Sequence, residues 1–180
     1  MPRSRTAWLS AVCNTVPEAI CYHEPTATLD RWESVVGLVT KGTYRYAGAA
    51  DSGLGLHLPR LIDMMPGVKV VVVWRDPDQV RESLRTLFPF VGEHHFLDIL
   101  QGHLTNLRDD VDVRWVQFPD LVESRKVVRL LRWLMPEATI CPEKVIELQR
   151  LNVQADMERV ARDVRAAVDD GRMAHLLGAS

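Results

Sequence analysis

The first ten residues combine side chains that bind anions with the start of a helix. Arg3 and Arg5 supply positive charge, and Ser4 and Thr6 can cap the helix that the apolar run 7–12 predicts. The unpaired backbone N–H groups at such a helix start attract a phosphate or a sulfate. The GxxxxGK[ST] pattern of ATP- and GTP-binding loops is absent, so the stretch predicts an anion site of another kind. The alternative is a frayed terminus.

A second group of candidate ligand residues begins at Arg75. Arg75 follows the most apolar run of the chain, and Ser83 comes eight residues later within a helical pattern. A guanidinium can hold a phosphate through two parallel hydrogen bonds, and a serine hydroxyl adds a further donor. The alternative is that Arg75 pairs with Asp76 or Asp78 and that Ser83 is an ordinary residue of a helix surface.

The elements that must position these residues alternate between short β-type runs and helical patterns. The sequence predicts strands at 19–22, 44–47, 68–74 and 113–118, with helices over 30–41, 58–65, 76–87, 96–107, 127–134 and from Glu143 onward. The four valines at 70–73 suit a parallel strand that is buried on both faces. We therefore expect an α/β fold with a parallel sheet covered by helices on both faces. We expect residues 1–180 to form one domain, with 143–180 as a helical C-terminal extension.

In such folds the ligand lies at the carboxyl ends of the strands. This rule brings three dipeptides to one edge: His23-Glu24, Asp51-Ser52 and Arg75-Asp76. Asp51 and Ser52 could contact a nucleotide or a second substrate, or they could form an ordinary Asx turn with Gly53.

The remaining histidines do not predict a metal site. His57 falls in a helical pattern, for which we expect a surface or core position. His94 and His95 are adjacent and therefore point to different sides of a helix. We expect no metal.

Composition limits the partners and the compartment. The 180 residues carry a formal charge of −2, which predicts neither nucleic acid nor an anionic membrane as a partner. The longest apolar run, 70–74, is far shorter than a bilayer span, and the start lacks the apolar stretch of a signal peptide. Three cysteines without metal spacing favour reduced thiols and a cytoplasmic protein. A narrow apolar stripe over 160–168 could pack on the domain or on a second subunit, which leaves a homo-oligomer possible.

Together, the opening stretch and the Arg75 group resemble the sulfotransferases that use 3′-phosphoadenosine 5′-phosphosulfate. The phosphosulfate loop of that family reads roughly P-[K/R]-S-G-T-[T/S]-W-L, and residues 2–9 here read PRSRTAWL. The family's 3′-phosphate motif has an arginine at a strand end and a serine eight residues later, as at Arg75 and Ser83. The resemblance runs over about residues 1–135 and looks closest to small, divergent bacterial and phage proteins. It implies a P-loop NTPase-like three-layer sandwich.

The resemblance also implies roles for the matching residues. Arg3 would neutralise the leaving group, and Arg75 and Ser83 would bind the 3′-phosphate. The phosphosulfate cradle and the adenine contact would come from the rest of the loop: Ser4, Arg5, Thr6, the backbone at Ala7, and Trp8 beside the adenine. Arg5 stands where the family has a glycine, so it either adds a phosphate contact or narrows the cradle. A sulfonate carries less charge than a phosphoryl group, so no Mg²⁺ is implied.

In this family a histidine or a glutamate takes the proton of the acceptor. His23 is our first choice, because the pKa of a histidine lies near neutral pH. Alternatively Glu24 is the base and His23 orients it, or both residues bind the substrate.

The chain departs from the family pattern at three further points. Ala7 replaces a hydroxyl residue of the loop, and no counterpart of the family's late RKG stretch is present. The family also has a strand of about five or six residues directly before the loop, whereas here the loop begins at Pro2. We expect either a strand encoded upstream of Met1 or a sheet built on the four strands predicted above.

The leading hypothesis is a sulfotransferase-like enzyme that moves a sulfonate to a hydroxyl or amine of an unidentified acceptor, either a small molecule or a protein. The main alternative is a catalytically degraded protein of the same fold, used for binding or assembly, with a phage-associated protein as one option. A small-molecule or nucleotide kinase is a weaker alternative, because the Walker A lysine and a Mg²⁺ carboxylate are missing.

Overall fold

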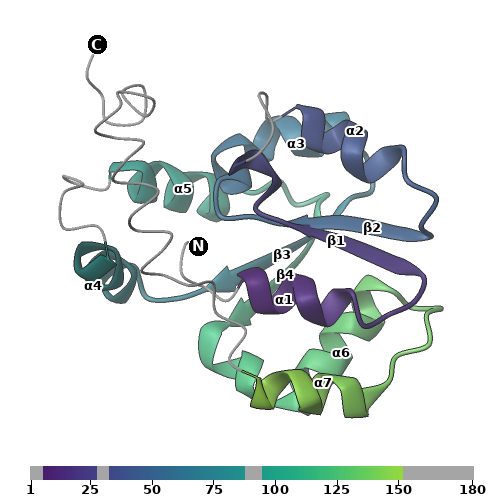
Figure 1. Ribbon diagram of the computed structural model, residues 1–180. Coiled ribbons are helices and arrows are strands. Elements are labelled where there is room, and N and C mark those ends of the chain that lie inside the picture. Colours follow the sequence, from purple (N-terminus) through teal and green to yellow (C-terminus); the bar gives the residue numbers. More distant parts are fainter. Residues whose placement is uncertain (1–5, 28–32, 88–94, 152–180) are drawn as a thin grey trace.

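The computed structural model describes residues 6–27, 33–87 and 95–151, and Figure 1 shows their arrangement. Within these ranges the chain forms four strands: β1 Ala19–His23, β2 Tyr46–Ala50, β3 Lys69–Trp74 and β4 Asp112–Gln117. The α-helices are α1 Thr6–Cys13, α2 Ser34–Thr40, α3 Leu58–Met64, α4 Pro77–Leu87, α5 His95–Thr105, α6 Ser124–Leu134 and α7 Pro142–Arg150. Three short 3-10 helices follow strands or loops: η1 Pro25–Ala27, η2 Leu54–His57 and η3 Phe118–Val122.

The strands form two parallel pairs. β1 pairs with β2 from Ala19 opposite Tyr46 to His23 opposite Ala50. β3 pairs with β4 over six residues each, from Lys69 opposite Asp112 to Trp74 opposite Gln117. Within the described ranges no ladder joins β2 to β3. The expected α/β class with parallel strands is therefore confirmed, but the strands make two small sheets of two strands each.

β3 is buried on both faces, as its run of valines predicts. Val71 and Val73 pack against the core cluster that contains α1, α6 and α7. Val70, Val72 and Trp74, which alternate with them, pack against the cluster formed with α3, α4 and α5. Figure 1 shows α1, α6 and α7 on one side of the strands and α2 and α3 on the other.

The first core cluster is built from helices with apolar residues at helical spacing. In α6 the buried positions are Val127, Val128, Leu130 and Leu131. The indole N–H of Trp8 donates to the carbonyl oxygen of Leu148 at 3.0 Å, which ties α1 to α7. α1 is thereby held between the strands and the C-terminal helices.

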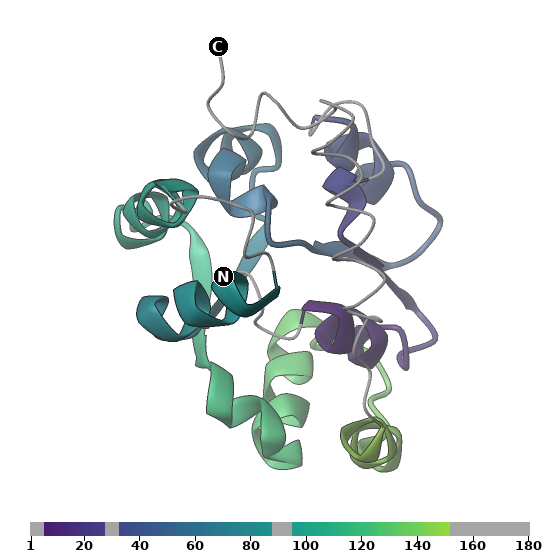
Figure 2. The same ribbon diagram turned by 60° about the vertical axis from the view of Figure 1, so that its left-hand side comes forward.

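α4 and α5 pack side by side, as the turned view in Figure 2 shows. Their buried contacts come from Val80 and Leu84 on α4 and from Leu97 and Leu100 on α5. Arg81 on α4 also forms an ion pair with Asp98 on α5. This helix pair covers β3 on the side opposite α1.

β2 lies a few residues further along the chain than the sequence predicts. The expected strand was 44–47, whereas β2 spans Tyr46–Ala50. Pairing with β1 sets these limits, because the Tyr46 N–H donates to the Glu18 carbonyl oxygen and the Glu24 N–H donates to the Ala50 carbonyl oxygen. Alanine and glycine carry little strand propensity, so the pattern alone could not locate the strand.

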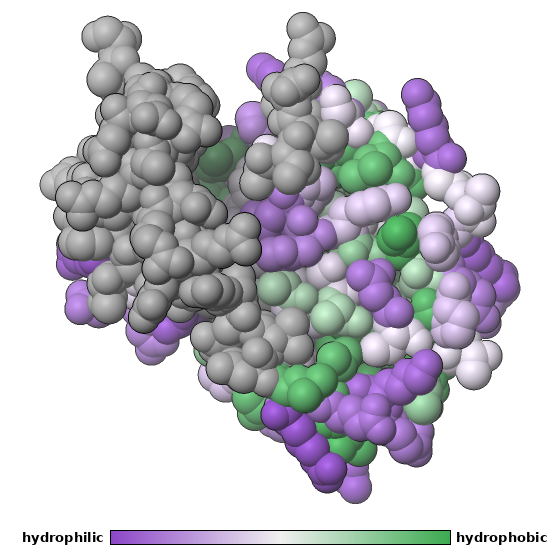
Figure 3. All heavy atoms as spheres, in the orientation of Figure 1, coloured by the Kyte–Doolittle hydropathy of each residue, from purple (hydrophilic) through white to green (hydrophobic). Residues whose placement is uncertain are grey.

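The C-terminal helical prediction is confirmed over α7, and its remainder, 152–180, lies outside the described residues. None of the helices in the described ranges is both long and apolar enough to cross a membrane. On the face drawn in Figure 3 the apolar side chains lie in small groups among hydrophilic ones. Isolated exposed apolar residues such as Val122 and Leu151 are ordinary for a folded protein.

Candidate functional site

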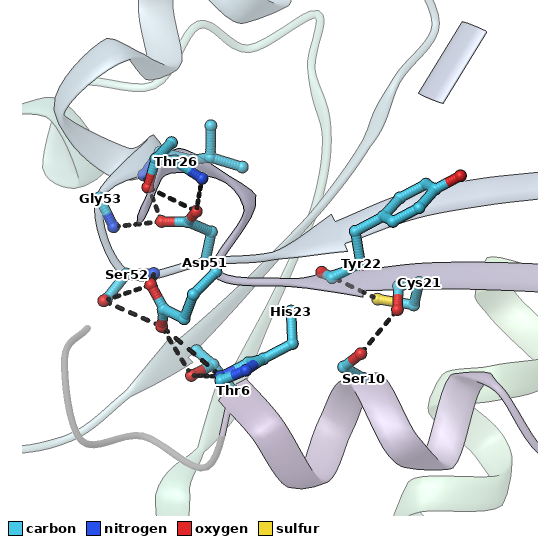
Figure 4. Close-up of polar contacts among 11 residues, drawn as sticks. Thr6, Ser10, Cys21, Tyr22, His23, Thr26, Asp51, Ser52 and Gly53 are labelled. Atoms are coloured by element: carbon cyan, nitrogen blue, oxygen red, sulfur yellow. Dashed lines mark hydrogen bonds and ion pairs between the residues drawn. The ribbon is translucent and has the colours of Figure 1, made fainter. Parts of the chain in front are cut away.

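The start of α1 meets the carboxyl ends of β1 and β2 (Figure 4). Thr6, the first residue of α1, donates from Oγ1 to Glu24 Oε1 at 3.0 Å. The same hydroxyl lies 3.4 Å from Nε2 of His23, the last residue of β1. The structure thus brings together residues that the sequence placed in two different groups, the anion loop and the strand ends.

Ser52 completes this cluster from the end of β2. Its backbone N–H lies 3.2 Å from both carboxylate oxygens of Glu24, and its hydroxyl lies 3.0 and 3.1 Å from them. With Thr6, three donor groups converge on one carboxylate. Glu24 is therefore held in a single orientation at the sheet edge.

The surroundings shift the pKa values of Glu24 and His23 toward each other. Burial raises the pKa of Glu24, and the negative charge of Asp51 raises it further. The hydrogen bonds from Ser52 and Thr6 lower the pKa and so offset part of this rise. Burial lowers the pKa of His23, with Asp51 opposing. His23 is thus more readily neutral near pH 7 than a free histidine, and a neutral imidazole can accept a proton.

The backbone at Glu24 is in the left-handed region, with φ of 45°. Within the described ranges it is the one non-glycine residue with positive φ. A side chain there costs about 1–3 kcal/mol, and such residues gather at functional sites. The turn aims the Glu24 carboxylate back at Thr6 and Ser52 instead of continuing β1.

Asp51 organises the adjacent turn. Its Oδ1 accepts from the backbone N–H of Gly53 at 2.6 Å and of Leu54 at 3.2 Å, which confirms the Asx turn. Its Oδ2 accepts from both the backbone N–H and the hydroxyl of Thr26, at 2.8 and 2.6 Å. Thr26 was not among the sequence-predicted residues. Its position three residues after the end of β1 is the sequence feature from which its role could have been predicted.

α1 is fixed over β1 by polar contacts to one residue. The Ser10 hydroxyl donates to the Cys21 carbonyl oxygen at 2.7 Å, and the Asn14 side-chain amide bonds both the N–H and the carbonyl of Cys21. These bonds hold the whole helix, so the placement of Thr6 does not depend on its own hydrogen bond.

Trp8 lies in the core and is 3% exposed. The resemblance implied a place beside adenine. In the structure the indole packs in the cluster with α6 and α7 and donates to Leu148, so it offers almost no surface to a ligand.

Arg75 and Ser83 lie where the sequence predicted them relative to β3. Arg75 follows the last residue of β3, and its guanidinium lies over the ring of Phe118, 4.9 Å from the centroid. Ser83 is half-buried in α4. Asp76, one of the suggested partners of Arg75, accepts from the backbone N–H groups of Asp78 and Gln79 and so caps α4.

Three predicted residues, Arg3, Ser4 and Arg5, lie outside the described residues, and their roles stay predictions. Ala7 is half-buried in the first turn of α1. His57 ends η2 at the start of α3, and burial lowers its pKa. Residues 6–27, 33–87 and 95–151 contain no group of three His, Cys, Asp or Glu side chains that could hold a metal ion.

A cavity of about 750 Å³ opens beside this cluster, with Thr6, Asp51 and Ser52 among its lining residues. A half-buried carboxylate, a half-exposed imidazole and two hydroxyls at one sheet edge can bind a polar group and move a proton. No protein-family model, curated protein or solved structure matches this chain.

Proposed function

We propose that the chain is a sulfotransferase-like protein with a three-layer P-loop architecture that binds 3′-phosphoadenosine 5′-phosphosulfate. It transfers the sulfonate to a hydroxyl or amine of a small-molecule or protein acceptor. The observation that carries the proposal is the contact of Thr6, at the start of α1, with Glu24, directly after β1. Thr6 lies beside the carboxyl ends of β1 and β2, where such folds bind ligands, and it is the last hydroxyl residue of the loop that the resemblance implies.

The chemistry of the described residues fits this donor in two ways. The first turn of α1 offers backbone N–H groups to an anion. Arg75 offers a guanidinium at the end of β3. Because the carboxylates of Glu24 and Asp51 repel phosphates, the nucleotide lies toward Arg75 and Ser83, and the acceptor lies toward His23.

In the proposed reaction the acceptor oxygen or nitrogen bonds to sulfur as the bond from sulfur to the bridging oxygen breaks. The bridging oxygen keeps the electron pair and leaves with 3′-phosphoadenosine 5′-phosphate, whose charge Arg3 would neutralise. The proton of the acceptor passes to Nε2 of His23. Glu24, 3.9 Å from that nitrogen, stabilises the imidazolium that forms.

Calorimetric titration with adenosine 3′,5′-bisphosphate and, separately, with ATP and Mg²⁺ tests the nucleotide site. We expect micromolar binding of the bisphosphate, weakened at least about tenfold in Arg75→Ala. Arg85→Ala, which removes a largely exposed cation from the same segment, is the matched control and should bind normally. A preference for ATP with Mg²⁺ would contradict the proposal and favour a kinase.

A second candidate is a protein of the same fold that binds or assembles without catalysis. The observation that favours it is the state of two loop residues: Trp8 is buried in the core, and the Thr6 hydroxyl is hydrogen-bonded to Glu24. A folded protein that binds neither nucleotide would support this candidate. Its three free thiols suit the cytoplasm, which remains the expected compartment for either function.

A further inference from the structure

Three arginines lie on one exposed face of α6. Arg125, Arg129 and Arg132 follow one another at intervals of four and three residues, which places side chains along one side of a helix. All three side chains are exposed. With a rise of 1.5 Å per residue they extend over about 10 Å of the helix axis. This side of α6 is therefore a row of three positive charges.

The row is not neutralised by carboxylates within the part of the chain that the structure describes. The adjacent Lys126 differs in this respect, because its ammonium forms ion pairs with Asp120 and Glu123. None of the ion pairs in residues 6–27, 33–87 and 95–151 includes one of the three arginines. Like charges three or four residues apart repel each other and weaken a helix. The stability of α6 alone therefore does not account for the row.

Apolar side chains lie beside the arginines, between α6 and α7. The two helices are neighbours in both ribbon views (Figure 1, Figure 2), and the Ser124 hydroxyl at the start of α6 donates to the side chain of Gln149 near the end of α7. A groove along them is lined by the three arginines and by Val128, Pro142 and Ile146. Ile146 is 39% exposed, although it is a large apolar residue. The groove thus combines an apolar floor with a positively charged side.

We propose that this groove binds an acidic amphipathic helix of a partner protein. In helix-in-groove recognition the apolar face of the incoming helix enters an apolar groove. Here that face covers Val128 and Ile146, and glutamates or aspartates at its edge pair with Arg125, Arg129 and Arg132. The site does not depend on the nucleotide chemistry proposed above.

The composition of the groove favours an acidic protein segment over a nucleic acid. A nucleic acid backbone is bound through its phosphates by positive charges and donors, and an apolar floor adds nothing to that attraction. The formal charge of the whole chain is −2, so no broad positive field attracts a nucleic acid. A guanidinium forms two parallel hydrogen bonds with a carboxylate, and arginine is enriched at protein–protein interfaces. The groove therefore fits a ligand that carries carboxylates and apolar side chains together.

A synthetic peptide tests the groove on the full chain. The probe is Glu-Ala-Leu-Glu-Glu-Leu-Leu repeated twice with both ends blocked, and calorimetry measures its binding. We expect saturable binding with a dissociation constant of about 100 μM or tighter. Arg129→Glu replaces an attraction with a repulsion and should weaken binding at least about tenfold. Absence of binding to the wild type would overturn the proposal.

Arg60→Glu is the matched control, because Arg60 is an exposed arginine of α3 outside the groove. This variant should bind the peptide normally, and equal binding by the two variants would contradict the proposal. Arg129→Glu places a carboxylate between Arg125 and Arg132, so α6 should stay folded. Chemical denaturation of both variants checks that weaker binding does not reflect unfolding.

Three further measurements separate the proposed partner from other occupants. The same peptide with every glutamate replaced by glutamine keeps its apolar face, and it should bind at least about tenfold more weakly. Equal binding of both peptides would show that charge is not recognised and would contradict the proposal. A single-stranded oligothymidine of about 14 nucleotides should bind more weakly than the acidic peptide at about 150 mM salt, and tighter binding would contradict the proposal. Sedimentation of the protein alone tests for a second copy in the groove: a dimer that Arg129→Glu dissociates would also overturn the proposal.

Discussion

The Thr6 hydroxyl donates to the Glu24 carboxylate over 3.0 Å and joins the first turn of α1 to the residue after β1. We expect Thr6→Val to remove this donor, to raise the pKa of Glu24 further, and to cost about 1 kcal/mol of stability. Thr6→Ser keeps the hydroxyl and should change neither quantity much. Carboxyl titration by NMR and chemical denaturation measure both. An unchanged Glu24 pKa in Thr6→Val would show that the bond is not formed.

The raised pKa of Glu24 predicts a pH dependence of stability. Between the ordinary value of 4.5 and the higher value in the folded protein, the folded state holds a proton that the unfolded chain has released. The stabilisation from this group is therefore complete below pH 4.5 and is lost as the pH rises through the folded pKa. Glu24→Gln should flatten this part of the profile, measured as the free energy of unfolding against pH.

Glu147→Gln, at an exposed position of α7, is the matched control and should leave that part of the profile unchanged. If the free energy of unfolding of the wild type, compared with that of Glu24→Gln, rose with pH above 4.5, the pKa of Glu24 would be lowered in the folded protein and the prediction would be wrong.

Asp51 influences the proton affinity of His23. Its negative charge raises the pKa of His23 against the larger effect of burial. Asp51→Asn removes the charge, so we expect the pKa of His23 to fall further, which NMR titration of the imidazole protons would measure. Asp110→Asn removes a charge that is paired with Arg108 at the surface, and it should leave His23 unaffected. A rise in the His23 pKa in Asp51→Asn would contradict this account.

Gly55 in η2 lies close to the core of α5. A Cβ built there would sit 2.1 Å from Cδ1 of Leu100, which is 1% exposed and has little room to move. Gly55→Ala should therefore cost about 1–3 kcal/mol in chemical denaturation. Gly102→Ala meets nothing within 4 Å in the interior of α5 and should stabilise by about 0.5–1 kcal/mol. Equal effects of the two substitutions would mean that η2 and α5 do not pack as described.

Much of the fold could be predicted because its strongest elements carry local signals. The valines of β3 predicted a strand buried on both faces, and the apolar spacing of α6 predicted its buried side. The predicted bounds of β2 were wrong because its YAGAA sequence has little strand propensity and its limits follow from pairing with β1. The division into two strand pairs depends on contacts between segments distant in sequence, which no local pattern reports.

The candidate site was predictable only in part. The rule that ligands lie at strand ends led to His23, Glu24, Asp51 and Ser52, which the structure brings together. The link from this cluster to Thr6 depends on how α1 packs over β1, through Ser10 and Asn14. The left-handed backbone conformation of Glu24 could not be predicted from the sequence either, because that conformation is typical of glycine or asparagine.

The two strand pairs are coupled by side chains instead of a backbone ladder. The core cluster around α1 takes residues from both pairs, Ala19 and Cys21 from β1 and Val73 from β3, whereas the strand residues of the other cluster come from β3 and β4 alone. Cooperativity between the halves of the molecule therefore passes through α1 and through the contacts of Arg45 and Tyr46 with Glu137. When both links are lost, we expect β1 and β2 to open as a separate unit at a lower free energy than global unfolding, while β3, β4 and their helices stay folded.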